Sequence, residues 1–316
     1  MGGRMKWFKY GCFGCLGLLA LLLVIAGTIG GLAWQRSTSI KMEDRVVTRD
    51  LPGEAGGPGT QGVPAGDLAA DMPGSADSPG GPAAGRVLLD LSSAEFRIEP
   101  GEPGEPIRVE GSFDRSRYAL EESFESAEGG SWEYTVRFRR VGGSGLITAL
   151  SEFMGGARPR VTVRLPPDHP MALDIELKRG GLEADLGGLW LTQADLDLAM
   201  GGSQVRFDTP LRQPMGRLAI KGRMGGGSFE KIGNASPSIL EVGFEMGGMN
   251  LDLGGDWAND AEISIKASMG GGSVRLPRGV SCEGLPEDAG ECEAAGPQSP
   301  TLSFTISARK KDLKFY

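Results

Sequence analysis

A first set of residues that could do chemistry is made of aspartates that alternate with leucine: Asp185, Asp195, Asp197 and Asp252. Two carboxylates facing each other are what a glycoside hydrolase needs, one as the acid and the other as base or nucleophile. Aspartates that alternate with leucine are also typical of the solvent-facing side of a β-strand. We favour the strand interpretation, because no further pattern around them indicates a pocket.

A second set consists of oxygen ligands within seven residues, namely Asp256, Asn259, Asp260 and Glu262. Such a cluster could hold Ca²⁺, which binds carboxylate and amide oxygens. The spacing matches no calcium-binding loop motif. A solvated turn therefore explains these residues better, and we expect no metal site here.

The chain of 316 residues has one histidine, His169, which lies between Pro167 and Pro170. A single histidine excludes metal sites that need two or three of them. A Ser/His/Asp triad would have to use this one loop residue. The sequence therefore predicts a protein that is not an enzyme and that carries no cofactor and no metal.

Four cysteines divide into two pairs. Cys282 and Cys292 flank a polar segment with Gly and Pro, and we expect them to form a disulfide, which an oxidising compartment permits. Cys12 and Cys15 lie at the start of an apolar run, and we interpret them as small packing residues. The expected disulfide places the C-terminal part of the chain outside the cytoplasm.

The formal net charge is −8. Binding to nucleic acid needs clustered Lys and Arg that neutralise phosphates. No stripe of basic and aromatic residues offsets the acidic balance. We therefore exclude nucleic acid as a partner.

The elements that position these residues are indicated by a repeat. Glycine pairs or triplets begin at Gly180, Gly201, Gly225, Gly247 and Gly270, at spacings of 21, 24, 22 and 23 residues. Alternating apolar and polar residues flank each of them, which is typical of strands. The sequence thus predicts an all-β, β-solenoid-like stack of about 22-residue Gly-Gly repeats, in which glycine turns the chain.

Most of these glycines follow a methionine, and we interpret the methionines as fillers of uneven gaps in the core. A metal site made of thioethers is the alternative, but soft-metal sites usually recruit His or Cys as well. Upstream, residues 86–165 also alternate in the manner of strands.

One upstream segment has helical rather than strand periodicity. Its apolar residues fall on one face of a short helix: Leu146, Ile147, Leu150, Phe153 and Met154. Such a helix would cover an open end of the β-core, because exposed sheet edges need protection. The alternative is a docking element for a membrane or a protein partner, and we retain these residues as candidates for that role.

Residues 11–34 contain no charged side chain. As a helix they would span about 36 Å, enough for a hydrocarbon core of ~30 Å. The alternative is a cleaved signal peptide, since Arg4, Lys6 and Lys9 precede the run and Gly31-Leu32-Ala33 near its end could be a cleavage site. The length favours a retained signal-anchor, and we expect residues 1–36 to form a single-pass transmembrane anchor.

Residues 37–85 follow, and their Pro- and Gly-rich composition predicts a disordered linker, because it offers too little apolar surface for a core. The β-repeat domain is then expected over residues 86–316.

Three stretches resemble a known family: LDLSSAEFRIEPG at 89–101, LDLGGDW at 251–257 and MGGGSVRLPRGV at 269–280. They are similar to the bacterial toast-rack proteins and adhesin-type β-repeat domains, which are related to the β domain of envelope-stress regulatory proteins. The resemblance covers about residues 86–281 and implies a β-solenoid-like stack at the cell envelope, often without enzymatic activity. It supplies no catalytic residue.

Together these features predict a membrane-anchored envelope protein that displays a non-catalytic interaction or scaffold domain. The expected location is the bacterial inner membrane, with the C-terminal domain outside the cytoplasm. Expected partners are the membrane, an envelope protein or glycan, and further copies of the chain, because a stack has two open ends. The alternative function is a regulator that senses envelope stress and acts on a membrane signalling partner.

Overall fold

The computed structural model describes residues 42–49, 51, 85–126, 131–141, 158–292, 294, 296–308 and 313–316. Within these ranges the regular structure is β apart from one short 3₁₀ turn, η1 (Ile232–Asn234), so the all-β prediction is confirmed. The strands are β1 (Met42–Arg49), β2 (Gly85–Pro100), β3 (Ile107–Asp114), β4 (Tyr118–Ser126), β5 (Trp132–Arg140), β6 (Arg160–Leu165), β7 (Met171–Asp185), β8 (Leu191–Arg206), β9 (Arg217–Glu230), β10 (Ile239–Asp252), β11 (Ala261–Arg275), β12 (Ser281–Glu283), β13 (Thr301–Ser307) and β14 (Leu313–Phe315).

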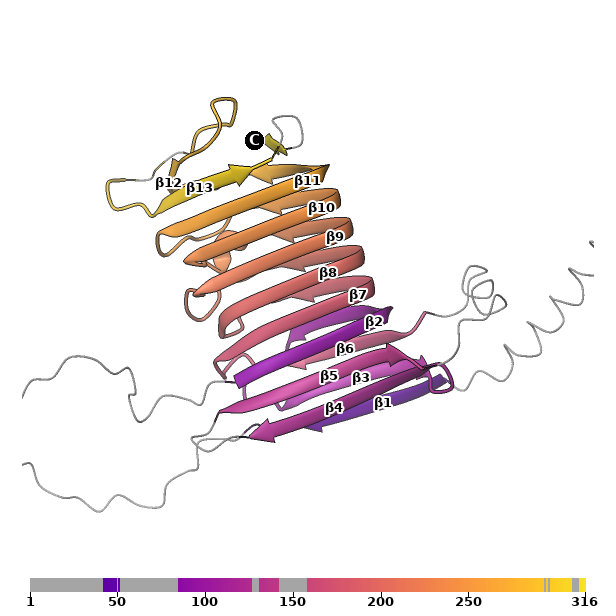
Figure 1. Cartoon of the computed structure of the whole chain (residues 1–316). Helices are drawn as coiled ribbons and strands as arrows, with labels where there is room; N and C mark the ends of the chain where they lie inside the picture. The colour runs from indigo at the N-terminus through magenta and orange to yellow at the C-terminus, as the bar shows by residue number, and fades with distance from the viewer. Residues whose placement is uncertain are drawn as a thin grey trace, which may run out of the picture.

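The long strands stack in parallel in the order β2, β7, β8, β9, β10 and β11 (Figure 1). Their register aligns the five glycine phrases: Gly180 pairs with Gly201, Gly201 with Gly225, Gly225 with Gly247 and Gly247 with Gly270. The spacing of about 22 residues is therefore the number of residues between a position in one strand and the equivalent position in the next strand.

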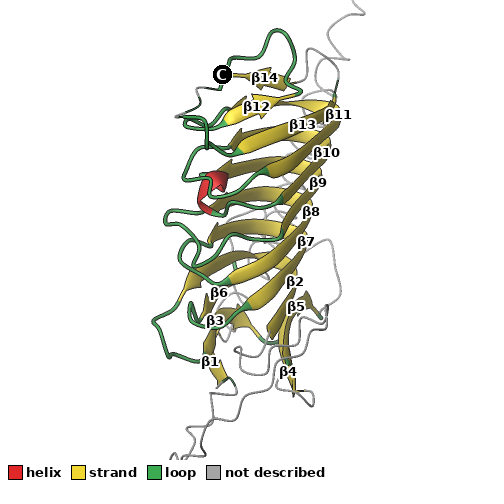
Figure 2. Ribbon diagram, turned by 90° about the vertical axis from the view of Figure 1, so that its left-hand side faces the viewer, coloured by secondary structure: helices red, strands yellow, loops and turns green. Residues whose placement is uncertain are grey.

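Each long strand bends sharply at its glycine phrase and returns across the opposite side of the stack (Figures 1 and 2). We call the side formed by the strand halves before the bend the first face, and the side formed by the halves after it the second face. In β2 the bend falls at Ser92 and Ser93, where the register shifts and Ser93 has a φ of 66°. The later strands use glycine at this corner instead.

The core lies between the two faces, because alternate residues of both strand halves point inward and are buried. In β9 two inward positions are glycine, Gly222 and Gly227, and aromatic rings fill the space above them. Phe229 is fully buried and packs edge-to-face on Phe244, with ring centroids 6.0 Å apart. The side-chain volume missing at the two glycines is thus filled by one aromatic ring from the same strand and one from the neighbouring strand.

Shorter strands continue both faces at the two ends of the stack. At the N-terminal end β5 and β4 extend the first face, while β6, β3 and β1 extend the second. At the C-terminal end β13 covers the first half of β11 and β14 its second half, and β12 pairs with β13. The segment after residue 300 therefore closes the stack with two separate short strands.

Strand β1 corrects part of the expected linker. Residues 42–49 were assigned to a disordered segment, but they pair antiparallel with β3 over its whole length. Val46, Val47 and Thr48 favour a strand, and the free edge of β3 offers an unpaired ladder that β1 covers. The remainder of 37–85 lies outside the described residues, apart from Leu51 and Gly85.

Candidate ligand-binding groove

The candidate carboxylates do not come together. Asp195 and Asp197 lie on the first face, whereas Asp185 and Asp252 lie after the bend on the second face. Each is bound to an arginine: Asp195 to Arg217 at 2.6 Å and Asp197 to Arg223 at 2.9 Å on one face, and Asp185 to Arg206 at 3.6 Å and Asp252 to Arg275 at 3.5 Å on the other. Carboxylates held this way act as parts of surface ion pairs rather than as an acid and base pair.

The oxygen ligands near residue 256 stabilise loops. Asn259 Oδ1 accepts a hydrogen bond from Ser236 Oγ at 2.7 Å, and Asp260 Oδ1 accepts one from the Thr301 N–H at 2.7 Å. The N–H of Asp256 donates to Asn234 Oδ1 at 3.1 Å. Among the described residues no group of three or more His, Cys, Asp or Glu side chains is placed to hold a metal ion.

His169 lies in the turn between β6 and β7, where its Nδ1 is 3.1 Å from Asp168 Oδ1. Asp168 Oδ2 accepts a hydrogen bond from the Gly104 N–H at 2.8 Å. Burial alone would raise the pKa of Asp168, but the hydrogen bonds from His169 and from backbone N–H groups outweigh it and lower the pKa. The pair therefore fastens this turn to the loop that follows β2.

Cys282 and Cys292 form the expected disulfide, with Cα atoms 5.7 Å apart. The bridge closes the loop after β12 at the C-terminal end of the stack. Both cysteines are partly buried against the core.

Two other expectations fall on residues outside the described ranges. They are the candidate docking residues Leu146, Ile147, Leu150, Phe153 and Met154, and the apolar run 11–34. Within the described ranges the structure contains no helix with the length and apolar character needed to cross a membrane.

The methionines that precede the glycines do not fill the core, which corrects the interpretation made from the sequence, whereas Met249, which follows Gly248, is buried in the core. Met224, Met246 and Met269 are exposed, Met269 to 64%, and only Met200 is partly buried. They pair in register across β8 to β11. The bend turns this column of side chains outward, because it comes directly before the corner.

A groove of about 1440 Å³ lies on the second face. Its lining comes from β6, β2, β7, β8, β9, β10 and β11. Six spacings between seven adjacent strands, at ~4.8 Å each, give the groove a length of roughly 29 Å across the stack. An open groove of this form suits an extended ligand rather than a small molecule.

Two columns of residues form most of the groove. The floor is the second glycine of each phrase, and the rail is the outward-facing residue two positions later in each strand. From β7 to β11 the floor is Gly181, Gly202, Gly226, Gly248 and Gly271, and the rail is Glu183, Gln204, Ser228, Asn250 and Ser273. From β8 onward the rail therefore carries amides and hydroxyls without charge.

The first and the second glycine of a phrase differ in backbone conformation and in the space around them. Gly201, Gly225 and Gly247 have φ near +140°, and a Cβ on any of them would overlap the backbone of the preceding strand. At Gly202 a Cβ would meet nothing within 4 Å, and at Gly226 and Gly248 the nearest atom would be 3.9 Å away. The corner requires the first glycine, whereas the fold leaves room for a side chain at the second.

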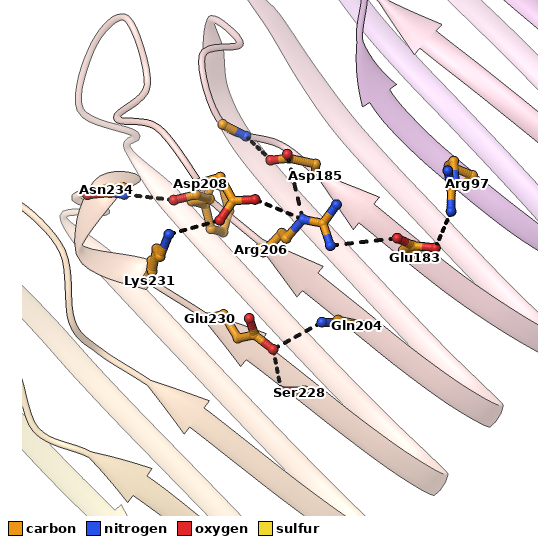
Figure 3. Close-up of polar contacts among 12 residues, drawn as sticks. Arg97, Glu183, Asp185, Gln204, Arg206, Asp208, Ser228, Glu230, Lys231 and Asn234 are labelled. Atoms are coloured by element: carbon orange, nitrogen blue, oxygen red, sulfur yellow. Dashed lines mark hydrogen bonds and ion pairs between the residues drawn. The ribbon is translucent and has the colours of Figure 1, made fainter.

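Charged residues occupy the end of the groove near β6 and β2 (Figure 3 shows part of this region). Arg97 binds Glu183 at 2.7 Å, Arg164 binds Glu99 at 2.8 Å, and Arg158 binds Glu95 at 3.2 Å. Exposed pairs of this kind contribute ~0–1 kcal/mol each. The groove thus changes from paired charges at one end to neutral polar groups at the other.

Rail residues also contact the charged column beside them. Gln204 Nε2 and Ser228 Oγ both donate to Glu230 Oε1, at 3.1 and 3.0 Å (Figure 3). Ser273 Oγ donates to Asn250 Oδ1 at 2.7 Å. These bonds orient the rail toward the groove.

Sequence reasoning missed this groove, because the rail residues differ in type and lie 21 to 24 positions apart. Alignment of the repeats on their glycine pairs could have found it, since every rail residue stands two places after the second glycine.

No protein-family model matches the chain, and no curated protein matches it in sequence. Among solved structures, a "putative cell adhesion protein" from Clostridium sporogenes is similar over 87% of this chain and 99% of that chain, with 13% identity and a TM-score of 0.41. A likeness this distant carries no argument about function.

Proposed function

We propose that this chain is a non-catalytic interaction protein whose β-solenoid-like stack binds an extended partner along its second face. The observation that carries the proposal is the groove that crosses seven strands and is lined by glycine and polar side chains. The arginine-bound aspartates support a role without catalysis, since each carboxylate already has a structural partner.

The proposed setting is the cell envelope, with residues 1–36 as a single-pass anchor in the inner membrane and the stack outside the cytoplasm. The disulfide between Cys282 and Cys292 supports this side of the membrane, because such bonds persist in oxidising compartments. The toast-rack resemblance of residues 86–281 fits the same setting. Protease treatment of intact and permeabilised cells tests it: digestion of the stack only after permeabilisation of the inner membrane would contradict it.

The proposed activity is tested by photo-crosslinking in cells from the rail. A photoreactive residue at Ser228 is expected to capture a partner, whereas the same residue at Lys221 on the first face is not. Equal capture from both faces would contradict binding in the groove. Capture of a membrane kinase would instead favour the alternative, a regulator of envelope stress.

A further inference from the structure

The neutral part of the groove has hydrogen-bonding groups that the described part of the protein leaves available. The amide nitrogen of Asn250 and the amide oxygen of Gln204 have no hydrogen-bond partner among the described residues. Unpaired amide groups on the surface of a groove are available to a polar ligand or to water, and these two show where such a ligand could bond.

The glycine floor points to close approach by a ligand. Glycine within a strand weakens it and is expected where something must lie against the backbone. The fold leaves space for a Cβ at Gly202, Gly226 and Gly248, yet each of these residues is glycine. A ligand resting on this bare surface accounts for all three at once.

The charges around the neutral tract select against an ionic polymer. Glu183 stands at one end of the tract, where it is paired with Arg97 and Arg206. The next column of β8 to β11 carries both signs of charge: Arg206, Glu230, Asp252 and Arg275. Because acidic and basic side chains are interspersed there, the column presents no field of one sign to an ionic chain, and the uncharged rail offers neither an anionic nor a cationic chain a direct partner. An uncharged ligand rich in hydroxyl groups matches the amides and hydroxyls of the rail.

The step of the rail also constrains the ligand. One rail residue recurs at each strand spacing of ~4.8 Å. A β-1,4-linked sugar unit is about as long as one such spacing, so successive sugars can meet successive rail residues. An extended peptide advances only ~3.3 Å per residue, so its residues would fall out of step with the strands.

We propose that the groove binds an uncharged linear polysaccharide that runs across the strands, with about one sugar per strand. The flat faces of the sugars lie on the floor formed by Gly202, Gly226, Gly248 and Gly271. Their hydroxyl groups bond to Gln204, Ser228, Asn250 and Ser273. This inference deepens the proposed function and rests on the groove being the binding surface.

The test is calorimetric titration of the full chain with β-1,4-linked glucose and N-acetylglucosamine oligomers of increasing length. Affinity is expected to rise with length up to about four sugars, one for each strand of the neutral tract from β8 to β11, and to level off beyond that. The monosaccharides are expected to bind too weakly to detect. Comparison of the two series shows whether acetamido groups add to the hydroxyl contacts.

Gly226→Val is the decisive variant, because its side chain enters open space above the floor and lifts a ligand away from the rail. Loss of one or two hydrogen bonds predicts an affinity lower by about tenfold or more. Gly243→Val is the matched control, since Gly243 lies on the first face of β10 and also has nothing within 4 Å of its Cβ position. The control is expected to bind like the unmodified chain, and thermal melting shows that both variants fold.

Three outcomes would overturn the proposal: binding of neither oligomer series, binding that Gly226→Val leaves unchanged, or tighter binding of acidic oligosaccharides that depends on Arg160. Sedimentation showing self-association that only Gly226→Val abolishes would also overturn it, because the groove would then be an interface between copies. If a protein crosslinks to Ser228 while every oligosaccharide fails to bind, the interaction function stands and the polysaccharide is wrong.

Discussion

Alanine at Gly247 is expected to destabilise the stack strongly, whereas alanine at the adjacent Gly248 is not. Gly247 has a φ of +133°, a conformation that costs an L-residue ~1–3 kcal/mol. Its Cβ would also overlap the carbonyl oxygen of Gly225 on the neighbouring strand β9. Moving that carbonyl weakens one or two ladder hydrogen bonds of ~0.5–1.5 kcal/mol each, so the total loss is about 1.5–6 kcal/mol.

At Gly248 the new Cβ would lie 3.9 Å from the Gly271 carbonyl oxygen, which is an ordinary contact. Loss of glycine's freedom in the unfolded chain then stabilises the fold by ~0.5–1 kcal/mol. Urea unfolding followed by circular dichroism measures both variants, and hydrogen exchange in β9 to β11 shows whether the loss is local, as expected for a stack of repeats. Equal free energies of unfolding for Gly247→Ala and Gly248→Ala would refute the assignment of different roles to the two glycines.

Three further predictions concern packing, the disulfide and acid stability. Phe229→Ala removes a fully buried ring and should lower the free energy of unfolding by ~3–5 kcal/mol in urea titrations; a change below about 1 kcal/mol would contradict the packing described. Cys282→Ser should cost ~2–3 kcal/mol, and a reductant should lower the melting temperature of the unmodified chain but not of the variant. The pKa of Asp168 is lowered in the fold, so its stabilisation is present above the ordinary carboxylate pKa of ~3.9 and is lost as the pH falls through the lowered value. Asp168→Asn should remove this part of the acid dependence in stability measured against pH, and an unchanged profile would show that the contacts with His169 and Gly104 contribute nothing.

The all-β fold could be predicted because its signal is local. Alternation around Leu196 and Leu218 marks strands, and glycine phrases recurring every 21 to 24 residues mark equivalent points of neighbouring strands. The prediction of disorder was wrong for residues 42–49. Val46 and Val47 favour a strand, but the charged and linker-like residues around them give no strand pattern. Residues 42–49 form a strand because β3 offers them a partner, and the paired residues lie 58 (Arg49 to Ile107) to 72 (Met42 to Asp114) positions away in the sequence.

The groove could not be read from any single repeat. Gln204, Ser228 and Asn250 are different residue types and each looks like an ordinary solvent-facing position. Only the register of β8, β9 and β10 places them in one column. The burial of the methionines before the glycines was predicted wrongly for a related reason. Alternation shows which residues of a strand share a side, but it does not show which way a side chain points where the strand bends.

The two glycines of each phrase therefore have different roles, the first in folding and the second in binding. The amino-acid composition alone does not distinguish these roles. The first is fixed by backbone geometry, because Gly201 and Gly225 hold positive φ angles against the carbonyl of the preceding strand. The second, as at Gly226, lies where a side chain would fit and where glycine weakens the strand. A weakness repeated along one column of the stack, beside a column of amides and hydroxyls, is better explained by a ligand on that surface than by the fold.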